Sequence, residues 1–375
     1  MPQSLIRWFP FLRWPRPTST LIRGETIAAL TVTVVMIPQS VAYAGLAGMP
    51  LVTGLYATFL PALAAVLFSS STRLSVGPSA LSCVLVGASL VGLAEPGSAQ
   101  WVMLAVWLAL LSGAMQLAVG ASGSAWMLNL VSSPVLTGFS QAAAVLIIAS
   151  QLPSLLGLKG PLSSLLQGGV AMDVEGLAYG VASLALFEVG KRVVPKLPTV
   201  LFVLVVAATA GYLTGHAARG RVVGGLPEGL PALYWPGLPD WGTFSALLAP
   251  AVVIALVSSL EMAASAKIES QRDGKRWDAN QDLVGQGMGK LVSAFSGAFP
   301  TSTSFSRSAI TLASGARTGW ATVAVTVLVL LVLLVATPAL HHVPAAVLAA
   351  VVVTAVGGLL KPRGVASVWH VGRGG

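Results

Sequence analysis

Long apolar stretches separated by short polar clusters follow one another along almost the whole chain. A helix needs about 20 mostly apolar residues to cross a bilayer core of about 30 Å. On this pattern we expect membrane spans near residues 24–37, 51–68, 101–119, 134–152, 177–189, 199–214, 244–267, 283–299, 320–337 and 343–360. The sequence therefore predicts an all-α polytopic membrane protein.

Two further apolar runs follow polar tracts in mid-membrane. One begins at Pro78 and ends near Leu93, and the other is Ser304–Leu312. Proline suits the first turn of a helix, because its missing N–H would have no partner there. A short helix that starts inside the bilayer aims unpaired N–H groups at the gap before it, which is tolerated only where the gap holds water or a ligand. We expect two half-helices that meet at the midplane.

The second half-helix lies in Gly297–Arg317, a stretch rich in hydroxyl side chains that also carries Arg307. Unpaired N–H groups, hydroxyl donors and a guanidinium all attract negative charge. We therefore expect this stretch to form half of an anion-binding site.

The same order of segments occurs twice along the chain. A span interrupted at Pro38 is followed by a full span and the half-helix at Pro78. From residue 244 the order returns, with Glu261 in the place of Gln39 and Ser304–Leu312 as the half-helix. Interrupted segments at matching places in two inverted halves indicate a transporter's midplane site. The positive ends of the two half-helices would then face each other.

Composition excludes a soluble protein, since 55% of the 375 residues are hydrophobic and only 9% are charged, against about 25% charged in soluble domains. The net charge of +9 does not indicate nucleic-acid binding, because Lys and Arg lie in short clusters between spans, as positive-inside topology requires. We expect a bacterial-type inner (plasma) membrane protein with a cytoplasmic N-terminus, residues 1–23 lying in the headgroup region. No cleaved signal peptide is expected, and the lone Cys83 excludes a disulfide within one chain.

Glu261 lies well inside its predicted span, where a carboxylate is costly unless it is protonated, paired or facing water. A carboxyl group poised between burial and a nearby arginine can exchange a proton in each transport cycle. We expect Arg307 to be its partner, so that protonation of Glu261 frees Arg307 for a dianion. The alternative is a static ion pair or an interhelical hydrogen bond.

Polar side chains beside the helix breaks are candidates for binding. Gln39 and Tyr43 lie four residues apart, which places them on one helical face. Ser79, Ser304 and Ser306 lie at the starts of the half-helices. The alternative for the glutamine is an ordinary interhelical hydrogen bond, and for each serine a bond to a backbone carbonyl.

The sequence offers little for enzymatic chemistry. No cluster of Cys, His and Asp has metal-ligand spacing, and neither a nucleotide-binding loop nor a Gly-x-Ser-x-Gly turn occurs. The histidines, His216, His341, His342 and His370, lie near segment ends, which disfavours an intramembrane hydrolase. We expect no enzyme, no metal and no cofactor, with energy drawn from ion gradients.

Three motifs occur in a fixed order along the chain. They are Pro38–Tyr56 (PQSVAYAGLAGMPLVTGLY), Ser75–Ala80 (SVGPSA), and Ser304–Ala309 (SFSRSA) with Ser314–Arg317 (SGAR) behind it. In order and spacing they resemble the hallmark motifs of the SulP (sulfate permease) family of anion transporters. The resemblance covers essentially the whole chain.

This resemblance implies a seven-plus-seven inverted-repeat transporter fold with a core domain and a gate domain. About twelve of the fourteen segments would be present. The core would comprise residues 24–120 and 243–337, the gate residues 121–215 and 338–375, and residues 216–242 would form an extracytoplasmic loop. An elevator-like movement of the core against the gate and a homodimer in the lipid bilayer are also implied.

Carried over by motif, the resemblance implies an anion held by segments 1, 3 and 10, largely through backbone N–H and hydroxyl donors. The binding groups would be Gln39, Tyr43, Ser79, Ala80, Ser304, Phe305, Ser306 and Arg307. The family's proton-coupled members use an acid on segment 8, and Glu261 holds that position here.

The expected function is secondary active transport of a small inorganic or dicarboxylate anion, sulfate above all, by proton-coupled symport. Alternatives are sodium-coupled bicarbonate transport, which sodium dependence would reveal, and an anion exchanger or channel on the same fold. Family members normally continue through two more segments into a cytoplasmic STAS domain, whereas this chain stops after residue 375. We therefore expect a C-terminally truncated protein, with an inactive remnant as a further alternative.

Overall fold

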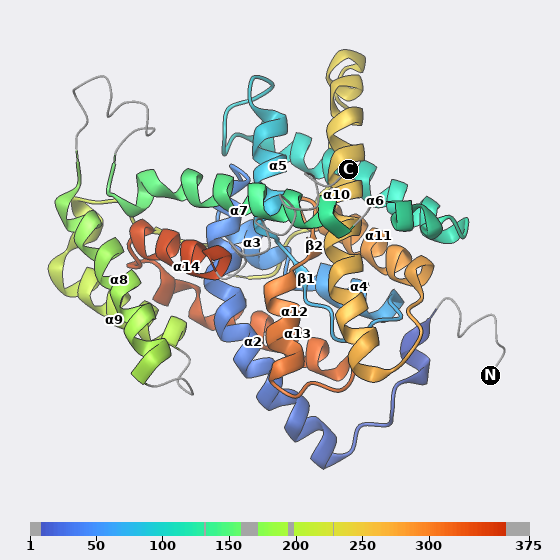
Figure 1. Ribbon diagram of the computed structural model, residues 1–375. Helices are drawn as coiled ribbons and strands as arrows, with labels where there is room; N and C mark the ends of the chain where they lie inside the picture. The colour runs from blue at the N-terminus through green and yellow to red at the C-terminus, as the bar shows by residue number, and fades with distance from the viewer. Residues whose placement is uncertain (1–8, 131–132, 159–171, 194–198, 228, 358–375) are drawn as a thin grey trace, which may run out of the picture. The chain divides into compact units, whose positions relative to one another are not determined.

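The computed structural model describes residues 9–130, 133–158, 172–193, 199–227 and 229–357. Within these residues the chain is almost entirely helical (Figure 1), which confirms the all-α fold class. The expected elements at residues 1–8 and beyond residue 357 lie outside the described residues.

The chain divides into two compact units. Unit 1 contains the described residues of Met1–Val131 and Gly229–Leu334, and unit 2 those of Ser132–Glu228 and Val335–Gly375. The expected division of labour between a core and a gate stays a prediction.

Unit 1 holds both half-helices. Its elements are the 3-10 turn η1 (Pro10–Arg13), α2 (Ser19–Leu46), α3 (Val52–Tyr56), α4 (Leu60–Phe68), β1 (Val76–Gly77), α5 (Ala80–Leu90), α6 (Ala99–Ala121), η2 (Ala125–Leu130), α10 (Trp241–Asp273), α11 (Ala279–Phe295), β2 (Ser302–Thr303), α12 (Phe305–Ala313) and α13 (Trp320–Leu331). Unit 2 contains α7 (Ser133–Leu155), α8 (Val174–Val193), α9 (Thr199–Thr214), η4 (His216–Ala218) and α14 (Ala345–Gly357).

Among the described residues, α2, α6 and α10 are each long and apolar enough to cross a membrane. Helix α10 has 33 residues, or about 50 Å at 1.5 Å per residue, so it extends well beyond a bilayer core. It begins at Asp240, whose carboxylate accepts hydrogen bonds from the backbone N–H and the hydroxyl of Thr243. These bonds hold the pKa of Asp240 below its usual range.

The expected break of the first span at Pro38 is wrong, because α2 runs unbroken through this residue to Leu46. Proline removes one helical hydrogen bond, and membrane helices tolerate that loss where other groups satisfy the freed carbonyl. Gln39 and Tyr43 therefore lie on a continuous helix.

The expected span at residues 51–68 is interrupted instead. It forms two helices, α3 and α4, separated at Ala57–Phe59. Phe59 has a backbone conformation outside the helical region, and Pro61 lies in the first turn of α4. Proline is well placed there because its missing N–H would have no helical partner.

The two half-helices are present. Helix α5 has 11 residues and α12 has nine, which gives lengths of about 16 Å and 14 Å, half of a bilayer core. Both start slightly later than expected, because Ser79 and Ser304 are the capping residues and not the first helical ones.

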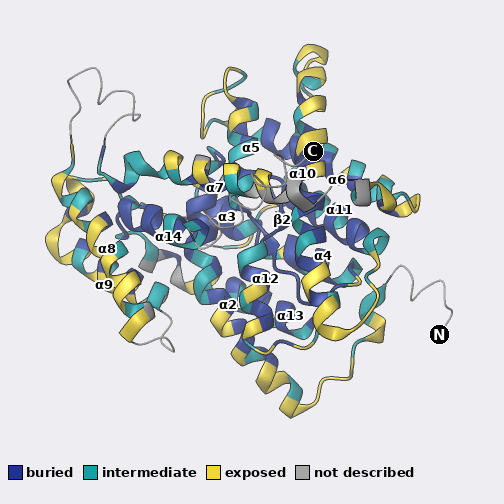
Figure 2. Ribbon diagram, in the orientation of Figure 1, coloured by how far each residue is buried: buried dark blue, intermediate teal, exposed yellow. Residues whose placement is uncertain are grey.

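The strands β1 and β2 lead directly into the half-helices and pair with each other in antiparallel register, Val76 with Thr303 and Gly77 with Ser302. A further hydrogen bond joins the Ser304 N–H to the Ser75 carbonyl at 3.0 Å. Both strands are buried (Figure 2). This pairing ties the start of one half-helix to the start of the other.

Helices α6 and α11 approach each other closely at two glycines. A Cβ on Gly287 would lie 2.8 Å from the carbonyl oxygen of Gly113, and a Cβ on Gly113 would lie 2.8 Å from the Cβ of Lys290. Small residues at such contacts let helix backbones pack tightly in membranes. The side chain of Lys290 is consequently enclosed between the helices.

Candidate functional site

Two helix N-termini define the candidate site in unit 1. The Ser79 hydroxyl accepts a hydrogen bond from the Ser82 N–H at the start of α5, and the Ser304 hydroxyl accepts one from the Arg307 N–H at the start of α12. Each cap satisfies one of the free N–H groups in the first turn and leaves others available. The helix dipoles add positive partial charge at the same ends.

Glu261 connects α10 to both of these starts. Its Oε2 accepts a hydrogen bond from the Ser79 hydroxyl at 2.8 Å and another from the Ser302 hydroxyl at 2.5 Å. The side chain is half-buried. The structure therefore brings the predicted acid into direct contact with Ser79, one of the predicted binding residues.

Arg307 is fully buried on α12. Its Nε donates to the Ser75 hydroxyl at 3.2 Å, and its Nη2 donates to the Pro78 carbonyl at 2.8 Å. The remaining nitrogen, Nη1, is buried without a hydrogen-bond partner in the part of the chain that the structure describes. This nitrogen is a donor that an anion in the site could use.

The expected ion pair between Glu261 and Arg307 is not formed. The carboxylate is held by two serine hydroxyls, and the guanidinium by a serine hydroxyl and a carbonyl. The two charges still act on each other. The pairing was wrong because the paired strands bring Ser302 to Glu261 and Ser75 to Arg307, and these hydroxyls occupy both groups.

The remaining predicted residues lie on the same elements with fewer contacts. Gln39 and Tyr43 are buried on α2, and the amide oxygen of Gln39 lacks a hydrogen-bond partner among the described residues. The Ser304 and Ser306 hydroxyls lie 3.3 Å apart. Phe305 and Ala80 are half-buried in the first turns of their helices, with no polar side-chain group of their own.

Sequence reasoning missed several polar residues beside the site. Ser75 and Ser302 hold Arg307 and Glu261, and Lys290 is buried on α11 with its ammonium bonded to Ser258 on α10. The hydroxyl-rich tracts around Ser75 and Ser302 were visible in the sequence. For Lys290 the available signal was a lysine well inside an apolar span.

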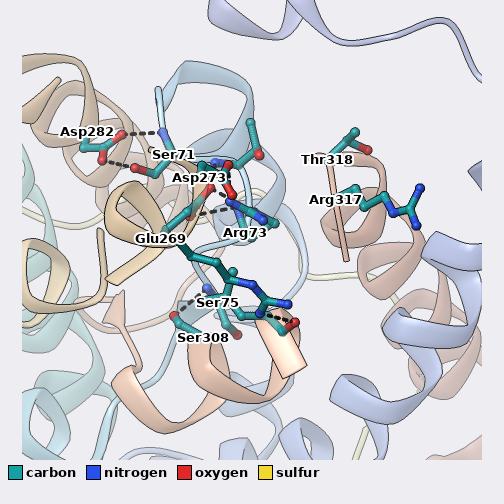
Figure 3. A network of polar contacts seen from close by, with 12 residues as sticks. Ser71, Arg73, Ser75, Glu269, Asp273, Asp282, Ser308, Arg317 and Thr318 are labelled. Carbon is teal, nitrogen blue, oxygen red and sulfur yellow. Dashed lines mark hydrogen bonds and ion pairs between the residues drawn. The ribbon is translucent and has the colours of Figure 1, made fainter. Parts of the chain in front are cut away.

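A second buried polar region lies at the far end of α10 (Figure 3). Arg73, in the loop between α4 and β1, donates to Glu269 at 3.1 Å and to Asp273 at 2.5 Å. Glu269 also accepts hydrogen bonds from the backbone N–H groups of Thr72 and Arg73. We call these three charged residues, Arg73, Glu269 and Asp273, the clasp.

Asp282, near the start of α11, secures the same loop. It accepts hydrogen bonds from the N–H group and hydroxyl of Ser71 (Figure 3). It also accepts from the N–H group and hydroxyl of Ser70 and from the indole N–H of Trp277. The clasp and Asp282 together fix the chain that leads into β1 and so position the first half-helix.

Comparison with known proteins identifies relatives along nearly the whole chain. The sequence model of the Sulfate permease family matches residues 22–375. Sulfate transporter 4.1, chloroplastic, of Arabidopsis thaliana is 31% identical over 388 residues, which cover 98% of this chain and 56% of the relative. Solute carrier family 26 member 6 of Homo sapiens is 31% identical over 404 residues, covering 98% and 53%. The chain thus spans about half the length of these curated relatives.

Solved structures share the fold. The murine Solute Carrier 26 family member A9 anion transporter in the inward-facing state matches with a TM-score of 0.89 and 21% identity, over 100% of this chain and 66% of that chain. The transmembrane domain of a cyanobacterium bicarbonate transporter, BicA, matches with a TM-score of 0.83 and 20% identity, over 95% of each chain. Both have the seven-plus-seven inverted-repeat fold, which confirms the predicted architecture. From its match to the family model and its similarity to these relatives, the chain belongs to the sulfate permease family.

Proposed function

We propose that this protein is a secondary active transporter that carries a small anion, sulfate above all, together with a proton. The observation that carries the proposal is the position of Glu261. Its carboxylate is hydrogen-bonded to Ser79 and Ser302, at the starts of both half-helices. A proton acceptor at that place lies beside the starts of both half-helices, one of which carries Arg307 in its first turn.

In this proposal the anion occupies the gap between α5 and α12. First-turn N–H groups of both helices donate to it, as do the hydroxyls of Ser304 and Ser306 and the free Nη1 of Arg307. Gln39, Tyr43, Ala80 and Phe305 line the gap. Donors of this kind suit a tetrahedral dianion, since several N–H groups converge on it from two directions.

Coupling then follows from electrostatic repulsion between two negative charges. An ionised Glu261 beside the gap opposes the entry of a dianion, and a proton on that carboxyl removes the repulsion. By linkage, a bound dianion must raise the proton affinity of Glu261 by the same factor. The proton and the anion therefore bind and dissociate together, and no ion pair has to break before the anion binds.

Transport would proceed by an elevator-like movement of the site-bearing core against the gate, in a homodimer embedded in the bilayer. We place the protein in a bacterial-type inner membrane with its N-terminus in the cytoplasm, because the positive charges cluster as the positive-inside rule requires.

The test uses the full 375-residue chain in proteoliposomes and radiolabelled sulfate. An inward proton gradient should accelerate uptake by the native protein, and Glu261→Gln should remove the acceleration. Normal acceleration in Glu261→Gln would contradict the coupling role. Acceleration of bicarbonate uptake by sodium at constant pH would favour sodium-coupled bicarbonate transport instead.

A further inference from the structure

Lys290 is an unexplained buried cation next to the site. It lies on α11 with its side chain fully buried. Its Nζ donates to the Gln116 amide oxygen on α6 at 2.7 Å and to the Ser258 hydroxyl on α10 at 2.8 Å. Both partners are neutral, and Lys290 has no carboxylate partner within the described part of the chain. A buried charge without an ion pair is costly and therefore calls for an explanation.

The neutral groups around Lys290 are themselves fully engaged. The Gln116 amide nitrogen donates to the Ala255 carbonyl and to the hydroxyls of Ser258 and Ser259. The Ser258 hydroxyl donates to the Ile254 carbonyl at 2.7 Å, so its oxygen is left to accept from Lys290. The cluster is thus arranged around a donor at Nζ, and it holds that nitrogen in one place.

Glu261 is the carboxylate on the same side of α10. Ser258 and Glu261 are three residues apart, hence on one helix face and about 4.5 Å apart along the axis. The Lys290 nitrogen bonds to the first of these residues, and its charge acts on the second. The lysine is therefore close enough to influence the carboxylate.

Three helices bring further ionisable groups near Glu261. Arg307 faces it from α12, Tyr43 from α2 and Cys83 from α5. Helices α4 and α6 carry no ionisable side chain. On α11 itself Asp282 is occupied by Ser71 and Trp277 near the start of the helix. Lys290 and Arg307 are accordingly the cations near the carboxylate among the described residues, and the Nη1 of Arg307 is left as a donor for the anion.

We propose that Lys290 is a positioning residue for the proton, a buried ammonium that, while it is protonated, weakens proton binding at Glu261 so that the carboxyl releases its proton in each cycle. The inference rests on the proposed proton coupling. Arg307 cannot supply this charge alone, because a bound dianion neutralises it at the moment when the proton has to be held or released. Lys290 is instead held by Gln116 on α6 and Ser258 on α10.

The test compares the pH dependence of Glu261 protonation in the full chain with Lys290→Met, Lys290→Gln and Lys290→Arg. The readout is the infrared band of the protonated carboxyl group, identified by its loss in Glu261→Gln, together with the pH dependence of sulfate uptake. Loss of the lysine charge should move both midpoints upward by about one pH unit, or about tenfold in proton affinity. Lys290→Arg keeps the charge and should leave both midpoints in place.

Ser259→Ala is the matched control, since it removes a hydroxyl of the same cluster that bonds Gln116 and not Lys290. It should titrate like the native protein. If Lys290→Met does not fold, Lys290→Gln takes its place, because the glutamine amide can still hydrogen-bond to Gln116 and Ser258. If the native protein shows proton-driven uptake but the carboxyl titration is unmoved in the neutral variants, the inference about Lys290 is wrong and the proposed function stands. Absence of proton-driven uptake in the native protein would overturn the proposed function instead.

Discussion

Helix α10 carries two glutamates, the buried Glu269 and the half-buried Glu261, eight residues apart and with different partners. Glu269 pairs directly with Arg73 at 3.1 Å in the clasp, where Asp273 adds a second carboxylate. Glu261 contacts no cation among the described residues and is held by the hydroxyls of Ser79 and Ser302. Glu269 thus forms an ion pair near the end of α10, whereas Glu261, nearer the middle, is bound by hydroxyl groups.

The difference indicates what each region is for. A buried carboxylate in direct contact with arginine is stabilised as a charge and is a poor partner for anything else. Serine hydroxyls can donate to a carboxylate or accept from a carboxylic acid, so Glu261 has partners in both protonation states. We infer that the clasp fixes the chain and that the site exchanges a proton.

The largest effect is expected from breaking the clasp with Arg73→Met. This change leaves Glu269 and Asp273 buried or partly buried without their cation, which should destabilise the protein by about 3–5 kcal/mol. Thermal unfolding in detergent measures the loss. The exposed pair Arg192–Glu188 provides the matched control, because Arg192→Met should cost about 1 kcal/mol at most. Equal unfolding temperatures for the two variants would show that the clasp does not stabilise the fold.

The second-largest effect is expected from Arg307→Met, which changes the site and leaves the clasp intact. Sulfate affinity should fall about 100-fold, corresponding to about 3 kcal/mol, because the anion loses its charged donor. Stability should change less than in Arg73→Met, since no carboxylate loses a direct partner. Sulfate binding and thermal unfolding of the same preparation measure both quantities. A variant that unfolds as readily as Arg73→Met while binding sulfate normally would contradict the assignment.

The smallest effect is expected from the hydroxyls that hold Glu261. Ser302→Ala removes one hydrogen bond to the carboxylate, about 1.5 kcal/mol for a bond to a charged group, and favours the protonated form. The pH for half-maximal sulfate uptake should rise by about one unit. Ser308→Ala is the control, because its hydroxyl accepts from the Ser75 N–H and does not touch Glu261. A shift of equal size in both variants would mean that the site responds to packing and not to that bond.

Much of the fold and part of the site could be predicted from local sequence. The half-helices followed from short apolar runs behind hydroxyl-rich tracts, and Glu261 and Arg307 stood out as charges in apolar surroundings. The break at Pro38 was wrong because a proline removes one hydrogen bond, and the local sequence does not say whether the neighbours restore it.

Contacts between distant segments could not be predicted. Arg307 bonds to Ser75, which is 232 residues away, and Glu261 bonds to Ser79, which is 182 residues away. The pairing of β1 with β2 brings the segments that carry these hydroxyls together. The same holds for Lys290, whose partner Gln116 lies 174 residues away on a helix without ionisable side chains.

Proton uptake on sulfate binding tests the central claim most directly. Sulfate is added to the purified full chain in weakly buffered detergent solution, and a pH indicator reports protons taken up at equilibrium. The native protein should take up protons as sulfate binds, and Glu261→Gln should bind sulfate without taking up protons. Sulfate binding without proton uptake in the native protein, or with equal uptake in Glu261→Gln, would contradict the account.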